Sequence, residues 1–246
     1  MQRAEYEATR RLEGSHWWFV GMRAVTKSLL LPYQEAARWD RLLDSGCGTG
    51  GNYSFLSRYA RDIVGIDYSP LALGFYSEQA GGAVAHAAGQ ALPFASGTFG
   101  AVTSFDVLSQ LPPGEDDQAL RECERVLRPG GLLLVRVPAY QWLFSGHDAV
   151  LRTYHRYNKR ELARKITAAG LRVRRLTYAN TLLFPVAAAR RLLQKLKVLP
   201  TSTDLVRLPG PINQTFLLAL RLESALLRRT GLPFGLSLVA IAQKQP

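Results

Sequence analysis

Short apolar runs alternate with amphipathic stretches through the middle of the chain. Apolar runs typical of buried strands lie at 41–46, 62–67, 83–88, 99–107, 128–138 and 171–179. Apolar residues recur at helical spacing at 53–60, 69–79, 116–127 and 159–170. Strands that alternate with helices form a mostly parallel sheet covered on both faces. The pattern therefore predicts an α/β fold.

Both ends of the chain depart from this alternation. Two helices are expected at 4–13 and 19–31, ahead of the first strand. Near the other end, helices are expected at 181–200 and 214–231, before a last strand at 234–244. A helical insertion between the final two strands is well placed to cap a substrate.

The first inserted helix is amphipathic. We expect its cations to line one side and its leucines to pack inward: Arg190, Arg191, Lys195 and Lys197 against Leu192, Leu193 and Leu196. We divide the single domain of 1–246 into an N-terminal helical lid (1–35), a core (36–180), a helical cap (181–235) and a last strand (236–246).

A glycine-rich loop follows the first expected strand, in "LLDSGCGTGGNY" at 42–53. Gly46, Gly48 and Gly51 spell G-x-G-x-x-G, which is typical of dinucleotide binding. Gly46, Gly48 and Gly50 equally spell G-x-G-x-G, as in enzymes that use S-adenosylmethionine (SAM). Asp67 ends the second strand, where a carboxylate can accept from both ribose hydroxyls. Because NAD and SAM both contain adenosine, these residues leave the cofactor open.

Two later segments make a family resemblance specific: "AAGQALPFASGTFGAVTSFDVLSQL" and "LRECERVLRPGGLLLV". Over residues 42–137 the chain resembles class I SAM-dependent methyltransferases, and it is similar to bacterial small-molecule methyltransferases of the quinone-biosynthesis type. The resemblance implies a Rossmann-like sheet of seven mostly parallel strands with helices on both faces. It also implies SAM as the cofactor and S-adenosylhomocysteine (SAH) as the product.

The resemblance assigns roles to positions. The loop residues would approach the methionine part of SAM, an acidic residue before them would orient its ammonium group, and others would hold ribose and adenine. These expected cofactor-binding residues are Asp44, Gly46, Cys47, Gly48, Asp67, Tyr68, Gln90, Ala91, Leu92 and Phe105. Gln90 stands where the family usually has an aspartate, and Ser109-Gln110 stands where many relatives have Glu-His.

The N-terminal "GSHWWFVGMR" resembles a tryptophan-rich segment of related bacterial methyltransferases. The resemblance implies that Trp17 or Trp18 covers the cofactor and that Arg23 pairs with its carboxylate as a fork. The alternative is that both tryptophans only pack in the core.

The expected catalytic residues follow the fifth strand, in "AYQWLFSGHDAVLRTYHRYNKREL". His147, His155 or Tyr157 could deprotonate a hydroxyl or orient a substrate anion. In the alternative reading, Asp148 and Arg156 form a structural ion pair and the rings are packing residues.

Charge is distributed unevenly. Residues 1–150 hold 13 Lys and Arg against 16 Asp and Glu, whereas residues 151–246 hold 18 against 3, so the net charges are −3 and +15. The basic part is either a solvated face or a surface for an anionic substrate or membrane. The run after the fourth strand, "SFDVL", differs from that of adenine methylases, and no nucleic-acid partner is expected. With two cysteines, Cys47 and Cys123, no metal site is expected.

The sequence therefore predicts methyl transfer from SAM to an oxygen, carbon or nitrogen of a small, anionic or lipid- or carrier-linked metabolite in the cytoplasm. One alternative keeps SAM binding and replaces transfer by rearrangement, decarboxylation or a non-catalytic role. A third class, an NAD-dependent oxidoreductase, has no nicotinamide-pocket pattern in this chain. The oligomeric state is left open.

Overall fold

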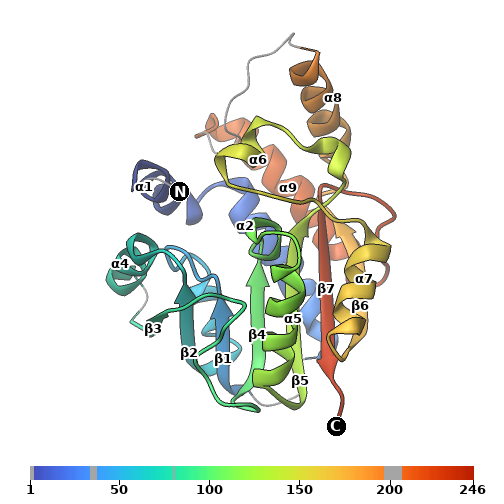
Figure 1. The fold of residues 1–246 in the computed structure, drawn as a ribbon. Helices are drawn as coiled ribbons and strands as arrows, with labels where there is room; N and C mark the ends of the chain where they lie inside the picture. The colour runs from blue at the N-terminus through green and yellow to red at the C-terminus, as the bar shows by residue number, and fades with distance from the viewer. Residues whose placement is uncertain (1–2, 34–37, 80, 197–206) are drawn as a thin grey trace.

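The computed structural model describes residues 3–33, 38–79, 81–196 and 207–246 (Figure 1). Seven strands form one sheet in the order β3-β2-β1-β4-β5-β7-β6. The strands are β1 (Trp39–Ser45), β2 (Ala60–Asp67), β3 (Ala83–His86), β4 (Phe99–Phe105), β5 (Leu127–Pro138), β6 (Leu171–Ala179) and β7 (Ser237–Lys244).

The sheet is mostly parallel, as predicted. β1 pairs with β2 on one side and with β4 on the other, and β4 pairs with β5, all in parallel. β7 is antiparallel to both of its neighbours, β5 and β6. Strand order reverses between β1 and β4, and ligands of open α/β sheets bind at the carboxyl ends of the strands beside such a switch point.

Helices cover both faces of the sheet. They are α1 (Arg3–Glu13), α2 (Trp17–Leu30), α3 (Tyr53–Leu56), α4 (Pro70–Gln79), α5 (Glu115–Val126), α6 (Gly146–Val150), α7 (Lys159–Ala168), α8 (Phe184–Lys195) and α9 (Gly210–Leu226). Short 3₁₀ turns lie at η1 (Leu31–Tyr33), η2 (Leu108–Gln110) and η3 (Gln141–Leu143). Among the described residues, no helix is long and apolar enough to cross a membrane.

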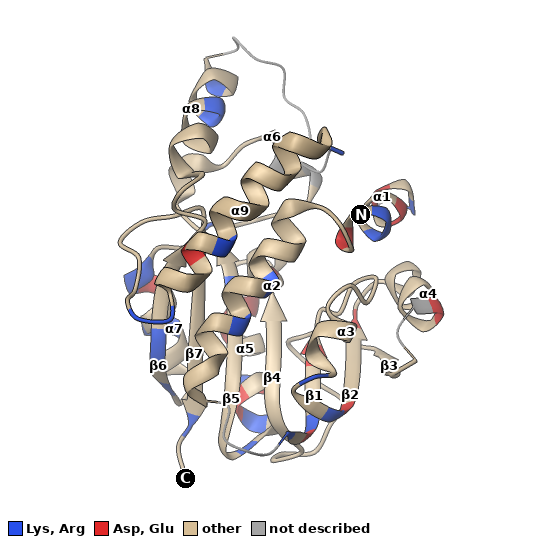
Figure 2. Ribbon diagram, turned by 180° about the vertical axis from the view of Figure 1, so that it is seen from behind, with Lys and Arg blue, Asp and Glu red and all other residues tan. Residues whose placement is uncertain are grey.

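Each face of the sheet has its own apolar core. On one face, α5 and α7 bury Leu120, Val126 and Ile166 against the strands. On the other face, α2 and α9 lie across the strands (Figure 2). There Val25 of α2 and Leu220 of α9 share one cluster with the strands. Elements from the two ends of the chain thus close the same face.

Helix α9, in the predicted cap, is anchored at both of its ends. Near its N-terminus, the Asn213 side chain accepts from the Trp17 amide at 2.9 Å and donates to the Ser15 carbonyl at 3.0 Å. Further along, the buried Glu223 carboxylate accepts from the backbone amides of Asn180 and Thr181 after β6. This helix therefore ties the N-terminal helices to the edge of the sheet.

Some expectations need correction. The helix expected at 53–60 ends at Leu56, because β2 already begins at Ala60. The expected inward packing of the α8 leucines is wrong: Leu192 is 56% exposed and Leu193 is 40% exposed, whereas Arg191 is buried. Lys197 lies outside the described residues. The predicted single basic side is also wrong, because Arg191 is buried whereas Lys195 is exposed beside the leucines.

The contact between α2 and α9 leads to a stability prediction. A Cβ at Gly21 would lie 2.3 Å from Leu220 Cδ1 and 2.7 Å from its Cβ. We expect Gly21→Ala to lower the free energy of unfolding by about 1–3 kcal/mol, as overpacking does. Gly74→Ala on α4 is the matched control, because nothing lies within 4 Å of its Cβ position. Urea unfolding of both variants measures the difference, and equal stabilities would contradict the close packing.

Candidate active site

The glycine loop leaves β1 at the switch point. The carbonyl of Ile66 in β2 accepts from the amides of both Gly46 and Cys47, at 2.8 and 2.9 Å. Gly46 has φ +79°, and a Cβ there would lie 2.1 Å from Val107 Cγ2. Glycine is therefore required at this position by both the backbone conformation and the close approach. The Cys47 side chain is buried against Tyr76, and burial raises the pKa of its thiol.

Asp67 lies at the end of β2, beside this loop. Its Oδ2 accepts from the Gly48 amide at 3.0 Å, and its Oδ1 accepts from the Ser69 amide at 2.9 Å. Each oxygen keeps a further lone pair for a ligand. The side chain of Tyr68 does not join it: Tyr68 is 77% exposed and its ring lies beside that of His86.

Asp44 is buried at the end of β1, and it is 2% exposed. Thr103 of β4 donates its hydroxyl to Asp44 Oδ1 at 2.6 Å. Burial raises the pKa of this carboxyl to about 6, although the hydrogen bond from Thr103 opposes the shift. A cation bound at the glycine loop would favour the charged form of Asp44 and would lower its pKa.

Glu13, at the end of α1, is a residue that the sequence analysis missed. Its Oε1 accepts from the Thr49 hydroxyl at 2.6 Å. Its carboxylate occupies the space next to Gly51, where a Cβ would lie 2.3 Å from its Cδ. Arg23 of α2 donates to the carbonyls of Glu13, at 2.6 Å, and Gly51, at 3.2 Å. The N-terminal helices are thus clamped onto the glycine loop.

A buried arginine, also missed from sequence, lies where β4 and β5 end. Arg136 donates through Nε and Nη2 to Asp106 Oδ2, at 2.8 and 2.6 Å. Its guanidinium lies 4.7 Å from the ring centroid of Trp18 and 5.0 Å from that of Phe105. The structure therefore brings together Trp18 and Phe105, two predicted cofactor-site residues from distant parts of the chain, around one cation.

The two tryptophans of the N-terminal motif differ in their surroundings. Trp17 donates its amide to Asn213, and its ring lies 5.3 Å from that of Phe216 on α9. Trp17 is therefore a packing residue between α2 and α9, whereas Trp18 lies at the carboxyl ends of the strands. His16 caps α2 by accepting from the Trp18 amide at 3.4 Å.

The predicted adenine contacts lie between β3 and β4. Gln90 donates through Nε2 to Glu115 Oε2 at 2.8 Å, and this fixes the orientation of its amide. Its buried Oε1 has no hydrogen-bond partner among the described residues. The Leu92 amide donates to Glu122 at 2.7 Å, so it is already engaged, and the Ala91 amide donates to the Ala88 carbonyl at 3.1 Å. Gln90 thus offers a free acceptor.

The predicted catalytic rings are held by carboxylates. The Tyr157 hydroxyl is buried and donates to Asp116 at 2.8 Å, and burial raises its pKa. His155 Nε2 lies 2.7 Å from Glu161 Oε1, and its ring packs on that of Tyr157. His147 lies on α6, but its side chain is outside the described part of the chain. The structure therefore pairs His155 with Tyr157 and gives each a structural partner.

The ion pair that the sequence offered as an alternative is present. Arg156 donates to the two oxygens of Asp148 at 2.8 and 3.2 Å, and to the Ala139 carbonyl at 3.0 Å. Both side chains are buried. This pair fixes α6 and the segment after β5 against the sheet.

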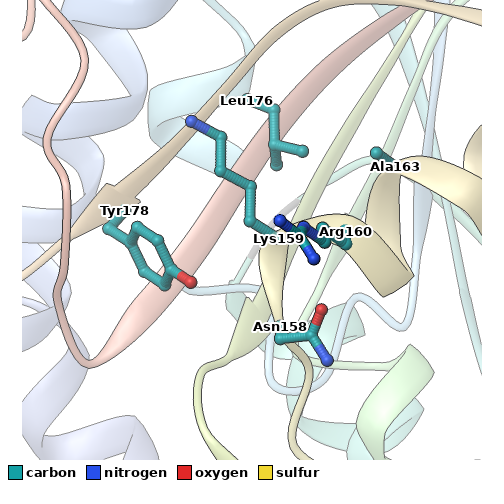
Figure 3. Close-up of a pocket in the computed structure, with 6 residues that line it drawn as sticks. All are labelled: Asn158, Lys159, Arg160, Ala163, Leu176 and Tyr178. Atoms are coloured by element: carbon teal, nitrogen blue, oxygen red, sulfur yellow. The ribbon is translucent and has the colours of Figure 1, made fainter.

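A separate hollow of about 520 Å³ opens beside the start of α7 (Figure 3). Its lining combines basic, aromatic and apolar side chains: Asn158, Lys159, Arg160, Ala163, Leu176 and Tyr178. It shares no residue with the glycine loop. We therefore locate the candidate active site at the loop, between β1, β2 and β4.

The strand order with an antiparallel β7, the glycine loop after β1 and the acidic residue that ends β2 define the Rossmann-like fold of class I methyltransferases. Residues 43–135 match the family model described as "Methyltransferase domain". This segment is therefore similar to methyltransferase domains.

Curated relatives of this chain are also named as methyltransferases. A probable SAM-dependent methyltransferase of Mycolicibacterium smegmatis is 30% identical over 135 residues, which are 54% of this chain and 52% of the relative. The chain thus spans about half the length of the curated relatives that it matches.

Solved structures share the fold. A chain of the complex between the Haloferax volcanii Trm112 methyltransferase activator and a methyltransferase has a TM-score of 0.65 and 18% identity, with 99% of this chain and 96% of that chain covered. The [4+2]-cyclase SpnF has a TM-score of 0.58 and 19% identity, with 90% and 81% covered.

The raised pKa of Asp44 predicts a pH-dependent stability. The unfolded chain loses this proton near pH 4, whereas the folded chain keeps it to about pH 6. Between these values the folded state binds more protons, so the group's contribution to stability falls as pH rises. Relative to Asp44→Asn, the wild type should lose about 2 kcal/mol of unfolding free energy from pH 4 to pH 6.5.

Urea unfolding at several pH values measures this slope. Asp40→Asn, on the same strand but exposed, is the control and should run parallel to the wild type. Parallel curves for Asp44→Asn and wild type would show that folding does not raise the pKa of Asp44.

Proposed function

We propose that this chain binds SAM at the glycine loop and transfers its methyl group to an oxygen, carbon or nitrogen of a small acceptor. One observation carries the proposal: Asp44 and Asp67 converge on the glycine loop at the switch point, inside the matched methyltransferase domain. When bound, the cofactor supplies an electrophilic methyl group on a sulfonium ion. The proposed reaction takes place in the cytoplasm.

The residues present fit this cofactor. Asp67 has a lone pair left on each oxygen and can accept from two ribose hydroxyls in a bidentate way. Gln90 Oε1 is a buried acceptor without a hydrogen-bond donor among the described residues, and the adenine amino group of bound SAM would donate to it. Asp44 can balance an ammonium group at the loop. Trp18 and Phe105 can exclude water from the reacting end.

Methyl transfer mainly requires the acceptor to be held in line with the methyl group. The carboxyl ends of β4 and β5, with Arg136 at their centre, provide the wall for this alignment. Arg191 of α8 is only 9% exposed and donates to Ser145, so one cation of the cap is turned inward. Arg191 therefore favours an anionic acceptor, such as a phosphorylated or lipid-linked metabolite.

The second candidate is a SAM-binding enzyme that rearranges or decarboxylates its substrate. It is favoured by the engagement of two of the three candidate bases, since Tyr157 and His155 are paired with carboxylates. Transfer to an acceptor that is already nucleophilic needs no base, and we therefore keep methyl transfer first.

Calorimetry with SAH, SAM and NADH tests the cofactor. We expect SAH and SAM to bind and NADH not to bind. Incubation with SAM labelled in its methyl group and with cell extracts then separates the two candidates. Transfer yields SAH and a labelled product in equal amounts, whereas rearrangement leaves the label on SAM.

The central prediction concerns Asp67. Asp67→Ala should weaken SAH binding about 100-fold or more, because two charge-assisted hydrogen bonds to ribose are lost. Asp62→Ala on the same strand, whose carboxylate pairs with Arg41 at the surface, is the control and should bind as wild type. Asp67→Asn, which keeps one acceptor, should give an intermediate affinity. Unchanged SAH affinity in a folded Asp67→Ala variant would remove Asp67 from the cofactor site.

A further prediction concerns the N-terminal helices as a lid. Tyr6 and Arg10 of α1 pack on Phe75 of α4, and Glu13 holds the glycine loop. We expect SAH to slow amide hydrogen exchange over residues 3–23. Glu13→Gln should speed exchange there in the absence of SAH, whereas Glu7→Gln on the exposed side of α1 should not. Equal protection with and without SAH would make these helices a fixed scaffold.

A further inference from the structure

Helix α8 presents its apolar side to solvent. Val186 is 61% exposed, Leu192 is 56% exposed and Leu193 is 40% exposed, while Arg191 is buried and donates to Ser145. Figure 1 shows α8 standing beyond α6 and α9, away from the strands. An exposed run of large aliphatic side chains on a protruding helix is typical of an interaction surface.

Aromatic side chains extend this apolar side. The Phe184 ring, in the first turn of α8, lies 6.1 Å from the ring of Trp142 and 5.4 Å from that of Phe234. Trp142 is 53% exposed and Phe234 is 41% exposed. These ring contacts join aromatic side chains from three segments of the chain: η3, α8 and the segment before β7. We define the outer cap surface by its exposed members: Trp142, Leu182, Val186, Leu192, Leu193 and Phe234.

The charges next to this surface are positive. Lys195 is exposed and donates to the Trp142 carbonyl, and Arg190 lies on the same helix. No Asp or Glu occurs between residues 181 and 196. Figure 2 shows α8 with basic residues in blue and no acidic residue in red. A second copy of this chain would bring the same cations against them, so electrostatics disfavours self-association and favours an anionic partner.

Tryptophan, leucine and basic side chains together match the layers of a bilayer surface. Tryptophan prefers the headgroup level, leucine enters the acyl boundary, and lysine and arginine meet anionic headgroups. We propose that the outer cap surface docks on an anionic phospholipid bilayer. The docking is independent of the methyl-transfer proposal, because it needs neither cofactor nor acceptor, and its failure would leave that proposal standing.

Vesicle binding tests this proposal directly. The full chain is sedimented with vesicles of phosphatidylcholine alone and of phosphatidylcholine with phosphatidylglycerol, at low and high salt. We expect binding only to the anionic vesicles, and weaker binding as salt rises. Arg190→Gln with Lys195→Gln should reduce the partition coefficient about 30-fold, since each cation near an anionic surface contributes about a factor of 5, and Arg190→Glu with Lys195→Glu should reduce it further.

Matched variants distinguish the contribution of the outer cap surface to vesicle binding from the effects of total charge and total hydrophobicity. Arg172→Glu with Arg174→Glu makes the same change in net charge at the start of β6, and it should retain most of the binding. Leu192→Ser should weaken binding about tenfold, whereas Leu71→Ser on α4, which removes a leucine that is 43% exposed, should not. Circular dichroism and thermal melts confirm that each variant is folded.

Three outcomes would overturn the proposal. Equal losses in the α8 and β6 charge variants would show that only total charge matters. Binding to neutral vesicles as strong as to anionic ones would remove the role of the cations. A stable dimer in light scattering that Leu192→Ser dissociates would identify a second copy of the chain as the occupant of this surface.

Discussion

The hydrogen bond from the Gly48 amide to the Asp67 carboxylate, 3.0 Å long, joins the turns that follow β1 and β2. Because Asp67 also accepts from the Ser69 amide, one side chain fixes both loops at the switch point of the sheet. The Ile66 carbonyl reinforces this link by accepting from two amides of the glycine loop. The position of the clamp at Glu13, and with it that of the N-terminal helices, follows from where this loop is held.

Two buried carboxylates, Glu223 and Asp44, differ in how far hydrogen bonds compensate their burial. Glu223 accepts from three successive backbone amides, which compensate its burial and fix α9 to the end of β6. Asp44 is as deeply buried but has one hydroxyl donor, Thr103, among the described residues. Its charge is therefore undercompensated, and a cationic ligand would stabilise it. An ammonium group on a ligand bound at the glycine loop would supply this positive charge.

Features that depend on neighbouring residues could be predicted from the sequence, whereas contacts between residues far apart in the chain could not. The glycine loop, Asp67 and the alternation of strands and helices follow from short patterns, and the family match confirms the fold that they implied. Arg136 was missed because its partners, Trp18 and Asp106, lie far away in the chain, although it is the one charge in the apolar run 132–137. The predicted inward packing of the α8 leucines was wrong because hydrophobic periodicity does not say which face of a helix the protein covers. The roles of the individual site residues stay predictions.

The place of β7 has a consequence for the order in which the chain acquires its structure. Strand β7, which follows β6 and α9 in the chain, inserts between β5 and β6, and it pairs with both over most of its length. Until residues 237–244 emerge, β6 has no neighbour and the edge of β5 is unpaired. Vectorial folding of the sheet therefore stops at five strands, and completion waits until β7 has been synthesised. A ribosome stalled in α9 would hold an aggregation-prone intermediate with two open strand edges.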